Sequence, residues 1–340
     1  MPSDDGPVRV GVVGCGAFGR LHARTLGRLA EARLVAVVDP DAGRLGELEG
    51  IDASVLRCGD VEEAIGRSGA EAWVVASSTA THAGVAERLL RGGDWVLVEK
   101  PLTATLAEAE ALGRWVDGES RRLMAGHVVL FNSEFRQLLD EAAGRGPMRL
   151  IDAVRHRSSE HADWFADEDP LRLTMVHDLY LVQALVDGEE PAVMGARWVR
   201  GGDGRRRVVT AELTWAGGLT ARLAASFMTP GGLGSDGFDR LEVLGDGWGA
   251  RIAPNPRPMV CWDQRVSYPM SLEIRQDAVS ATGMLAEELR CFCRVVRGRQ
   301  DVPRGARYAD ALQLMRWIDR LAASADAGEG PQFEDEEARC

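Results

Sequence analysis

Hydrophobic and polar residues follow one pattern over roughly the first 130 positions. Short runs that are apolar throughout, such as 8–13 and 95–99, alternate with longer stretches of helical spacing. Strands that are apolar on both faces are typical of parallel sheets covered by helices on both sides. A doubly wound α/β sheet of the Rossmann type is therefore predicted. Its strands are expected at 8–13, 34–39, 54–57, 72–76, 95–99 and 122–127.

A second pattern begins near residue 150, where apolar and polar residues alternate over longer runs. This period of two predicts half-buried strands, and Ala216-Gly217-Gly218 between two of them predicts a hairpin turn. The result is a second α/β domain with an open, mostly antiparallel sheet. Its strands are expected at 150–157, 193–200, 207–215, 219–228 and 239–244, with helices at 132–143, 279–296 and 306–323.

A chain of 340 residues suits two domains at about 150 residues each. We expect a dinucleotide-binding domain at 1–128 and a domain for substrate and oligomer contacts at 129–323. The acidic tail, 324–340, is expected to be poorly ordered.

Composition narrows the class of function. The net charge of −12 and the scattered arginines argue against a nucleic-acid surface, which needs a basic patch. The acidic N-terminus lacks the features of a signal peptide, and no apolar stretch approaches about 18 residues. A cytoplasmic protein that acts on a small molecule is expected, without membrane contact. The six cysteines show no metal-ligand spacing, so no metal is predicted.

A glycine motif marks a cofactor site. Gly14-Cys15-Gly16-Ala17-Phe18-Gly19 stands between the first predicted strand and a helix, where glycines let a pyrophosphate approach the helix N-terminus. Asp39 follows the second predicted strand and could accept hydrogen bonds from a ribose. Because Asp39 and Asp41 would repel a 2'-phosphate, NAD is favoured over NADP. Arg44 is the reason to keep NADP open.

Lys100 is the only lysine of the chain, and it lies in Glu99-Lys100-Pro101 at the end of an apolar run. An ammonium can donate a proton near neutral pH when its pKa falls on burial, whereas a guanidinium cannot. Lys100 is therefore predicted to take part in the chemistry.

The segments GVVGCGAFGRLHARTL, WVVASSTATH and VLVEKPL resemble the Gfo/Idh/MocA family of nicotinamide-dependent oxidoreductases, and AGHVVLFN and MVHDLYLVQAL extend the resemblance. It implies a Rossmann domain and a second domain whose sheet mediates homodimer or homotetramer contacts. It also implies a catalytic lysine at Lys100. Ser77, His82 and Glu99 lie in the matching segments and are expected to join the cofactor site.

The resemblance also places a catalytic histidine at His177, which in the family belongs to an Asp-x-x-x-His segment. Here the aspartate position is Leu173, and Asp178 cannot replace it because adjacent helical residues point about 100° apart. A family arginine that helps to hold polar substrates is Leu130 here, two residues before Asn132. These departures suggest a substrate with fewer hydroxyl groups.

Other candidates have competing interpretations. His22 and His127 suit structural roles, and His82 suits a position near the cofactor. Arg155 and Arg157 could hold a diphosphate or belong to a solvated strand face. Trp164 lies in a polar and aromatic loop, with His161, that could close over substrate or remain solvated. The predicted substrate-binding residues are Asn132, Arg155, Arg157, Trp164 and His177.

Together these features predict NAD-linked hydride transfer at a secondary alcohol or ketone of a sugar, cyclitol or similar metabolite. His177 would take the hydroxyl proton while Lys100 stabilises the developing alkoxide. One alternative is a reductase for a keto-sugar, free or nucleotide-linked, or for an imine. Another is a regulator that binds the cofactor without catalysis.

Overall fold

The computed structural model describes residues 6–116, 122–165, 168–230, 237–255, 261–262, 266–267, 274–276 and 280–328. The chain forms two compact units. The first comprises Met1–Leu139, Gln183–Gly188 and Glu273–Met315. The second comprises Asp140–Val182, Glu189–Leu272 and Arg316–Cys340. The predicted domain boundary at residues 128/129 stays a prediction.

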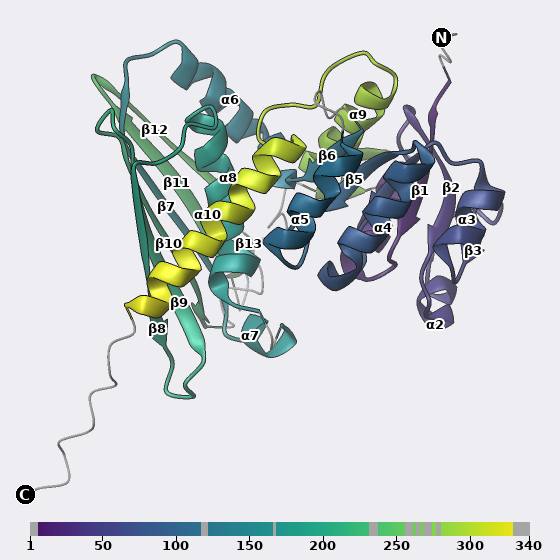
Figure 1. Cartoon of the computed structure of the whole chain (residues 1–340), viewed down its shortest axis with the longest axis horizontal. Coiled ribbons are helices and arrows are strands. Elements are labelled where there is room, and N and C mark those ends of the chain that lie inside the picture. Colours follow the sequence, from purple (N-terminus) through teal and green to yellow (C-terminus); the bar gives the residue numbers. More distant parts are fainter. Residues whose placement is uncertain are drawn as a thin grey trace, which may run out of the picture. The chain divides into compact units, whose positions relative to one another are not determined.

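The first unit contains a parallel sheet with the strand order β3-β2-β1-β4-β5-β6 (Figure 1). This order is that of a dinucleotide-binding Rossmann sheet, as the sequence predicted. The strands are β1 (Val8–Val13), β2 (Ala32–Val38), β3 (Leu56–Cys58), β4 (Ala72–Val75), β5 (Trp95–Glu99) and β6 (Leu123–Gly126). All strand pairs in this sheet are parallel.

Helices connect these strands and bury an apolar core that includes Val13, Trp73 and Leu89. They are α1 (Ala17–Leu26), α2 (Ala42–Gly46), α3 (Val61–Ser68), α4 (Thr79–Gly92), α5 (Leu106–Leu112) and the short η1 (Gly113–Trp115). Later parts of the chain complete the unit. They are η2 (Val128–Phe131), β15 (Ile274–Gln276), β16 (Ala281–Gly283) and α9 (Met284–Val296), which packs against both η2 and α1.

The second unit is built on a sheet with the order β12-β11-β7-β10-β9-β8. Its strands are β7 (Met148–Ser158), β8 (Val193–Arg200), β9 (Arg206–Thr214), β10 (Thr220–Thr229), β11 (Phe238–Gly245) and β12 (Trp248–Asn255). The expected hairpin joins β9 and β10, and Gly218 takes the positive φ of 84° that its turn requires. The β7–β10 pair is parallel, so the sheet is mixed.

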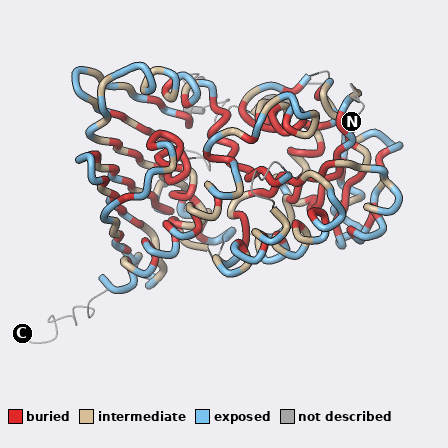
Figure 2. The backbone as a smooth tube through the Cα atoms, turned by 45° about the horizontal axis from the view of Figure 1, so that its top comes forward, coloured by how far each residue is buried: buried red, intermediate tan, exposed pale blue. Residues whose placement is uncertain are grey.

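One face of this sheet is covered. Along β7, Ile151, Ala153 and Arg155 are buried while Asp152 and Val154 are partly exposed. Figure 2 shows how buried, intermediate and exposed positions alternate along the chain. The remaining elements of the unit are α7 (His161–Trp164), the π-helix η3 (Leu171–Met175), β13 (Cys261–Trp262) and β14 (Val266–Ser267). Three helices contribute residues to both units: α6 (Ser133–Ala143), α8 (Val176–Leu185) and α10 (Tyr308–Ala327).

The structure departs from the predicted elements at a few places. Strand β12 was not predicted, and residues 281–283 form strand β16 where a helix was expected. Helix α10 extends to Ala327, so it includes the first residues of the predicted tail. The rest of the tail, residues 329–340, lies outside the described residues. Among the described helices, none has both the length and the apolar character needed to cross a membrane.

Candidate functional site

The glycine turn between β1 and α1 is set by close backbone contacts. A Cβ at Gly14, which has a φ of 95°, would lie 2.5 Å from the backbone of Ser77. A Cβ at Gly19 would lie 1.9 Å from the carbonyl oxygen of Gly14. A Cβ at Gly16 would meet nothing within 4 Å, and Gly16 caps α1 without a side-chain hydrogen bond. The helix N-terminus therefore has open space beside Gly16, which fits a pyrophosphate group.

Asp39 follows β2 and is held beside this turn. Its carboxylate accepts hydrogen bonds from the backbone N–H of Cys15 (2.8 Å) and of Asp41 (2.9 Å), and its residue is only 3% exposed. Arg44 lies 3.7 Å from Asp39 and 3.6 Å from Asp41. A carboxylate has about four acceptor positions, so Asp39 retains capacity for a ribose hydroxyl. Burial, together with Asp39, raises the pKa of the Cys15 thiol to about 11.

His82 links the loops that follow β4 and β5. Its Nδ1 lies 2.9 Å from the carbonyl oxygen of Pro101, and its Nε2 lies 3.1 Å from the carbonyl oxygen of Ser77. The ring is buried, and the Lys100–Pro101 peptide bond beside it is cis. Of the predicted cofactor residues, His82 thus positions two loops through their backbone, whereas Ser77 remains half-buried with its Oγ 2.7 Å from Thr81 Oγ1.

Glu99 at the end of β5 points into the protein. Its Oε1 lies 2.7 Å from His22 Nε2, and its Oε2 accepts the backbone N–H of Lys100 at 3.1 Å. Glu99 is 7% exposed and His22 is fully buried, with the ring of Phe18 against it in a T-shaped contact. Glu99 thus holds the backbone of Lys100, and the cofactor contact expected from sequence stays a prediction. Lys100 itself is half-buried.

His127 has the structural surroundings expected for it. Its Nδ1 donates to the carbonyl oxygen of Gly305 at 2.6 Å, and burial lowers its pKa to about 4. The imidazole is therefore neutral near pH 7 and fixes the end of β6.

In the second unit, His177 lies in the first turn of α8, directly after the π-helix η3. Its Nδ1 is 2.7 Å from the hydroxyl oxygen of Tyr180, whose side chain is fully buried. A partner on one ring nitrogen fixes the ring orientation and the tautomer of a histidine. Tyr180 was missed in the sequence, although its spacing of three residues from His177 on a helix indicates a shared face.

The two leucines at family polar positions have local explanations. Leu173 belongs to η3 and its N–H donates to the carbonyl oxygen of Asp169 at 3.0 Å. Leu130 is 6% exposed, and a Cβ at Gly305 would approach its side chain to 2.9 Å. Leu130 is thus a packed core residue of the first unit.

Arg155 lies in a network of buried ion pairs. Its guanidinium contacts both carboxylate oxygens of Asp178 and donates to Asp239 at 2.6 Å, and all three residues are buried. Arg157 adds a second arginine to Asp239. These ion pairs join β7, α8 and β11, and a substrate contact of Arg155 or Arg157 stays a prediction.

Asn132 and Trp164, two further candidates for substrate binding, have different surroundings. Asn132 is fully buried, and its Oδ1 accepts the N–H of Phe135 at 3.0 Å, which caps α6. Trp164 on α7 is 59% exposed, and its ring lies 5.3 Å from that of His161. Trp164 is available to a ligand, whereas Asn132 has a structural role.

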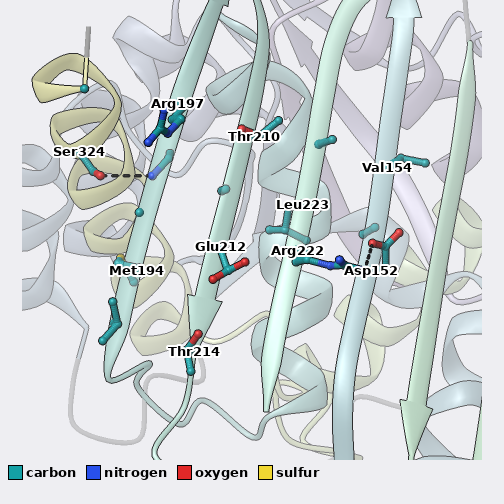
Figure 3. Close-up of a pocket in the computed structure, with 17 residues that line it drawn as sticks. Asp152, Val154, Met194, Arg197, Thr210, Glu212, Thr214, Arg222, Leu223 and Ser324 are labelled. Atoms are coloured by element: carbon teal, nitrogen blue, oxygen red, sulfur yellow. Dashed lines mark hydrogen bonds and ion pairs between the residues drawn. The ribbon is translucent and has the colours of Figure 1, made fainter. Parts of the chain in front are cut away.

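A hollow of about 790 Å³ lies on the less covered face of the second sheet (Figure 3). Its floor carries the ion pair of Arg222 and Asp152 (3.2 Å), and Ser324 accepts the N–H of Ala196 at its edge. None of the predicted site residues lines this hollow.

Residues 8–127 match the model of a family described as an oxidoreductase family with an NAD-binding Rossmann fold. The chain is 37% identical over 189 residues to inositol 2-dehydrogenase 1 of Saccharopolyspora erythraea, a match that covers 54% of this chain and 55% of the relative. It is 31% identical over 222 residues to UDP-N-acetylglucosamine 3-dehydrogenase of Acidithiobacillus ferrooxidans, covering 64% and 67% of the two chains.

The same fold occurs in solved structures. The GenD2 protein of gentamicin A biosynthesis, solved in complex with NAD, superposes with a TM-score of 0.80 at 20% identity and covers 95% of each chain. At this identity, the likeness concerns the fold alone.

Proposed function

Because the chain belongs to the oxidoreductase family with an NAD-binding Rossmann fold, we propose that it transfers a hydride between NAD and a secondary alcohol or ketone. The substrate class we propose is a sugar, a cyclitol or a similar metabolite. The two relatives are named for an inositol and for a nucleotide-linked amino sugar, both of which carry ring hydroxyl groups.

One observation supports the proposal most. The glycine turn after β1 and the loops after β4 and β5 lie at the carboxyl edge of one parallel sheet, and His82 ties the last two together. This edge is where doubly wound sheets bind nucleotides. Lys100, the only lysine of the chain, lies in one of these loops.

Gly16 and Asp39 support NAD as the cofactor. The space beside Gly16 suits the pyrophosphate, and the Asp39 carboxylate suits ribose hydroxyls. When bound, the nicotinamide supplies the hydride chemistry. NADP remains the alternative because Arg44 lies within 4 Å of Asp39 and could pair with a phosphate.

The remaining steps fall to side chains of this protein. We assign to Lys100 the stabilisation of the alkoxide, and to His177 the transfer of the hydroxyl proton. If Tyr180 accepts the Nδ1–H of His177, Nε2 keeps the lone pair that a base requires. Tyr180 would then fix the orientation of the His177 ring.

Two coarser features also stay proposals: a cytoplasmic location, and a homodimer or homotetramer formed through the second sheet. The face shown in Figure 3 supports the second, because it combines the ion pair of Asp152 and Arg222 with the partly exposed Val154 and Met194. Light scattering on the wild type and on Val154→Glu tests it, and a monomeric wild type contradicts it.

Turnover tests the function. The purified protein is incubated with NAD or NADP and a panel of inositols, hexoses and nucleotide sugars, and reduced cofactor is measured. We expect turnover of at least one ring alcohol and a loss of about 100-fold or more in Lys100→Arg. Arg67→Lys makes the opposite substitution at an exposed position and serves as the control. It should leave turnover unchanged.

A double variant tests whether the two residues serve one step. Lys100→Arg with His177→Gln should lose little more than the worse single variant, because groups that act as a unit are not additive. Cofactor binding without turnover across the panel, including keto-sugars and imines in the reducing direction, would instead support a non-catalytic regulator.

A further inference from the structure

Three buried ionisable side chains meet behind the loop that carries Lys100. They are His22 on α1, Glu99 at the end of β5 and Glu288 on α9, and one nitrogen or oxygen atom of each lies within 4.8 Å of the others. All three belong to the first unit, with exposures of 0%, 7% and 0%. Two carboxylates this close cannot both carry a charge without a large cost.

Hydrogen bonds distinguish the two carboxylates. Glu99 receives two donors, the His22 ring at Oε1 and the Lys100 backbone N–H at Oε2. Neither oxygen of Glu288 has a hydrogen-bond partner within the described residues. Donors stabilise the charged form of an acid and burial destabilises it, so the negative charge belongs on Glu99.

His22 does not supply a compensating positive charge. Its Nε2 is the nitrogen that contacts Glu99, whereas its Nδ1 is buried and has no partner in the part of the chain that the structure describes. An imidazolium would place a second N–H there without an acceptor. The neutral tautomer with the proton on Nε2 satisfies Glu99 and leaves only a lone pair at Nδ1.

A metal ion fits this geometry less well than a proton. Two ligand atoms on one tetrahedral zinc ion lie about 3.4 Å apart, given bonds of about 2.1 Å. The 2.7 Å between His22 and Glu99 is instead the length of a hydrogen bond.

We propose that Glu288 is a positioning residue that stays protonated, so that the cluster holds a single negative charge, on Glu99, directly behind Lys100. The residue acts through Glu99, which holds the backbone of Lys100. The link to catalysis rests on the function proposed above, whereas the protonation of Glu288 does not.

The surrounding groups agree with this assignment. Burial and the nearby Glu99 carboxylate raise the pKa of Glu288 well above its ordinary range. Cys291, one turn further along α9, has a thiol pKa of about 12, and His127 has a pKa of about 4. Neither is charged near neutral pH. Lys100 acts on His127, and Arg294 and Arg136 act on Cys291, as the cations whose charges reach these neighbours.

The single lysine makes the test direct. Protein labelled with 13C at lysine Cε gives one lysine resonance, and its titration reports the proton affinity of Lys100 without any assay of activity. Glu288→Gln replaces a neutral acid with a neutral amide, so the midpoint should stay at the wild-type value. Glu99→Gln removes a charge and should lower the midpoint by about 1 to 3 units. An equal fall in Glu288→Gln would overturn the proposal.

Stability against pH gives a second readout. An acid whose pKa is raised by folding makes its full contribution to the stability of the fold below its unfolded pKa, about 4.3. That contribution to stability declines as the pH rises. The difference in Tm, Glu288→Gln minus wild type, should therefore increase as the pH rises from 5 to 8. A constant difference would contradict the proposal, and Glu288→Leu, also uncharged, should show the same trend if the glutamine variant folds poorly.

Infrared spectroscopy and metal analysis complete the experiment. The difference spectrum of wild type minus Glu288→Gln at neutral pH should contain the carbonyl band of a protonated carboxylic acid. A carboxylate band instead, or stoichiometric metal lost in the variant, would overturn the assignment. Failure of the proposed function would appear only as absent turnover and would leave these readouts unchanged.

Discussion

Asp39 combines a structural and a recognition role in one carboxylate. Two backbone N–H groups hold it beside the glycine turn. In the proposed function, the same carboxylate favours a ribose hydroxyl over a 2'-phosphate, and so NAD over NADP.

Asp39→Asn keeps the shape of the side chain and removes its charge. Affinity for NAD should fall by about 10- to 100-fold, the worth of a hydrogen bond to a charged group, while affinity for NADP falls less or rises. Calorimetric titration of both cofactors measures the ratio. Asp246→Asn is the control, because Asp246 is an exposed aspartate of the second unit, outside the proposed cofactor site. Tighter binding of NADP by the wild type would refute the assignment.

Tyr180 allows a similarly local test. Tyr180→Phe removes only the hydroxyl that contacts His177, so kcat should fall by about 10-fold, with a changed pH profile. Tyr308→Phe is the matched control, since its hydroxyl donates to the carbonyl oxygen of Ala109. It should alter stability alone. An unchanged pH profile in Tyr180→Phe would remove Tyr180 from the mechanism.

The sequence indicated residues whose type or spacing stands out in the chain, such as Lys100, the only lysine, and the glycines of the turn. It did not indicate Tyr180 or Glu288, because a tyrosine or a glutamate on a helix has many ordinary roles. Their importance depends on burial and on a partner, and in Glu288 that partner lies nearly 200 positions away in the chain.

At the scale of elements, a buried ion network joins three parts of the second unit. Arg155 of β7 pairs with Asp178 of α8 and with Asp239 of β11. Because Asp178 follows His177, the network also fixes the start of the helix that carries the proposed base. Ion pairs of this kind hold a specific arrangement even where they add little stability.

Arg155→Met leaves the buried Asp178 carboxylate without its arginine and removes one of the two arginines on Asp239. The free energy of unfolding should fall by about 3 to 5 kcal/mol, measured by urea denaturation. Arg149→Met on the same strand breaks the exposed pair with Asp246 and should cost about 0 to 1 kcal/mol. Equal costs for the two variants would contradict a special role for the buried network.

Most elements were predictable where the hydrophobic period was clear. Strands β1, β5 and β8 have the predicted bounds. Strand β12 contains Gly249 and Pro254, which weaken any strand signal, and it lies at the edge of its sheet. The parallel pairing of β7 with β10 could not be predicted, because period-two patterning reports the buried face of a strand and not its neighbour.

At the scale of the molecule, acid should destabilise the fold through His127. Its pKa is about 4 in the folded protein and about 6.5 when unfolded, so the unfolded chain binds the proton first as pH falls. The stabilisation is present above pH 6.5 and declines by about 3 kcal/mol as the pH falls to 4. His127→Gln should flatten this part of the stability curve by that amount. Unfolding curves at several pH values measure it. Partial burial also lowers the pKa of His156, but less than that of His127, so His156→Gln should flatten the curve less.

The order of elements along the chain affects how the first unit can fold during synthesis. Ala125 of β6 donates its backbone N–H to the carbonyl oxygen of Ala306 at 2.7 Å, and α9 packs against η2 and α1. A ribosome that adds about 5 to 20 residues per second makes α9 roughly ten to thirty seconds after β6. During that interval η2 and α1 lack the helix that packs against them in the folded protein. The time of greatest risk for aggregation, and of greatest demand for chaperones, is thus set by the position of α9 in the chain.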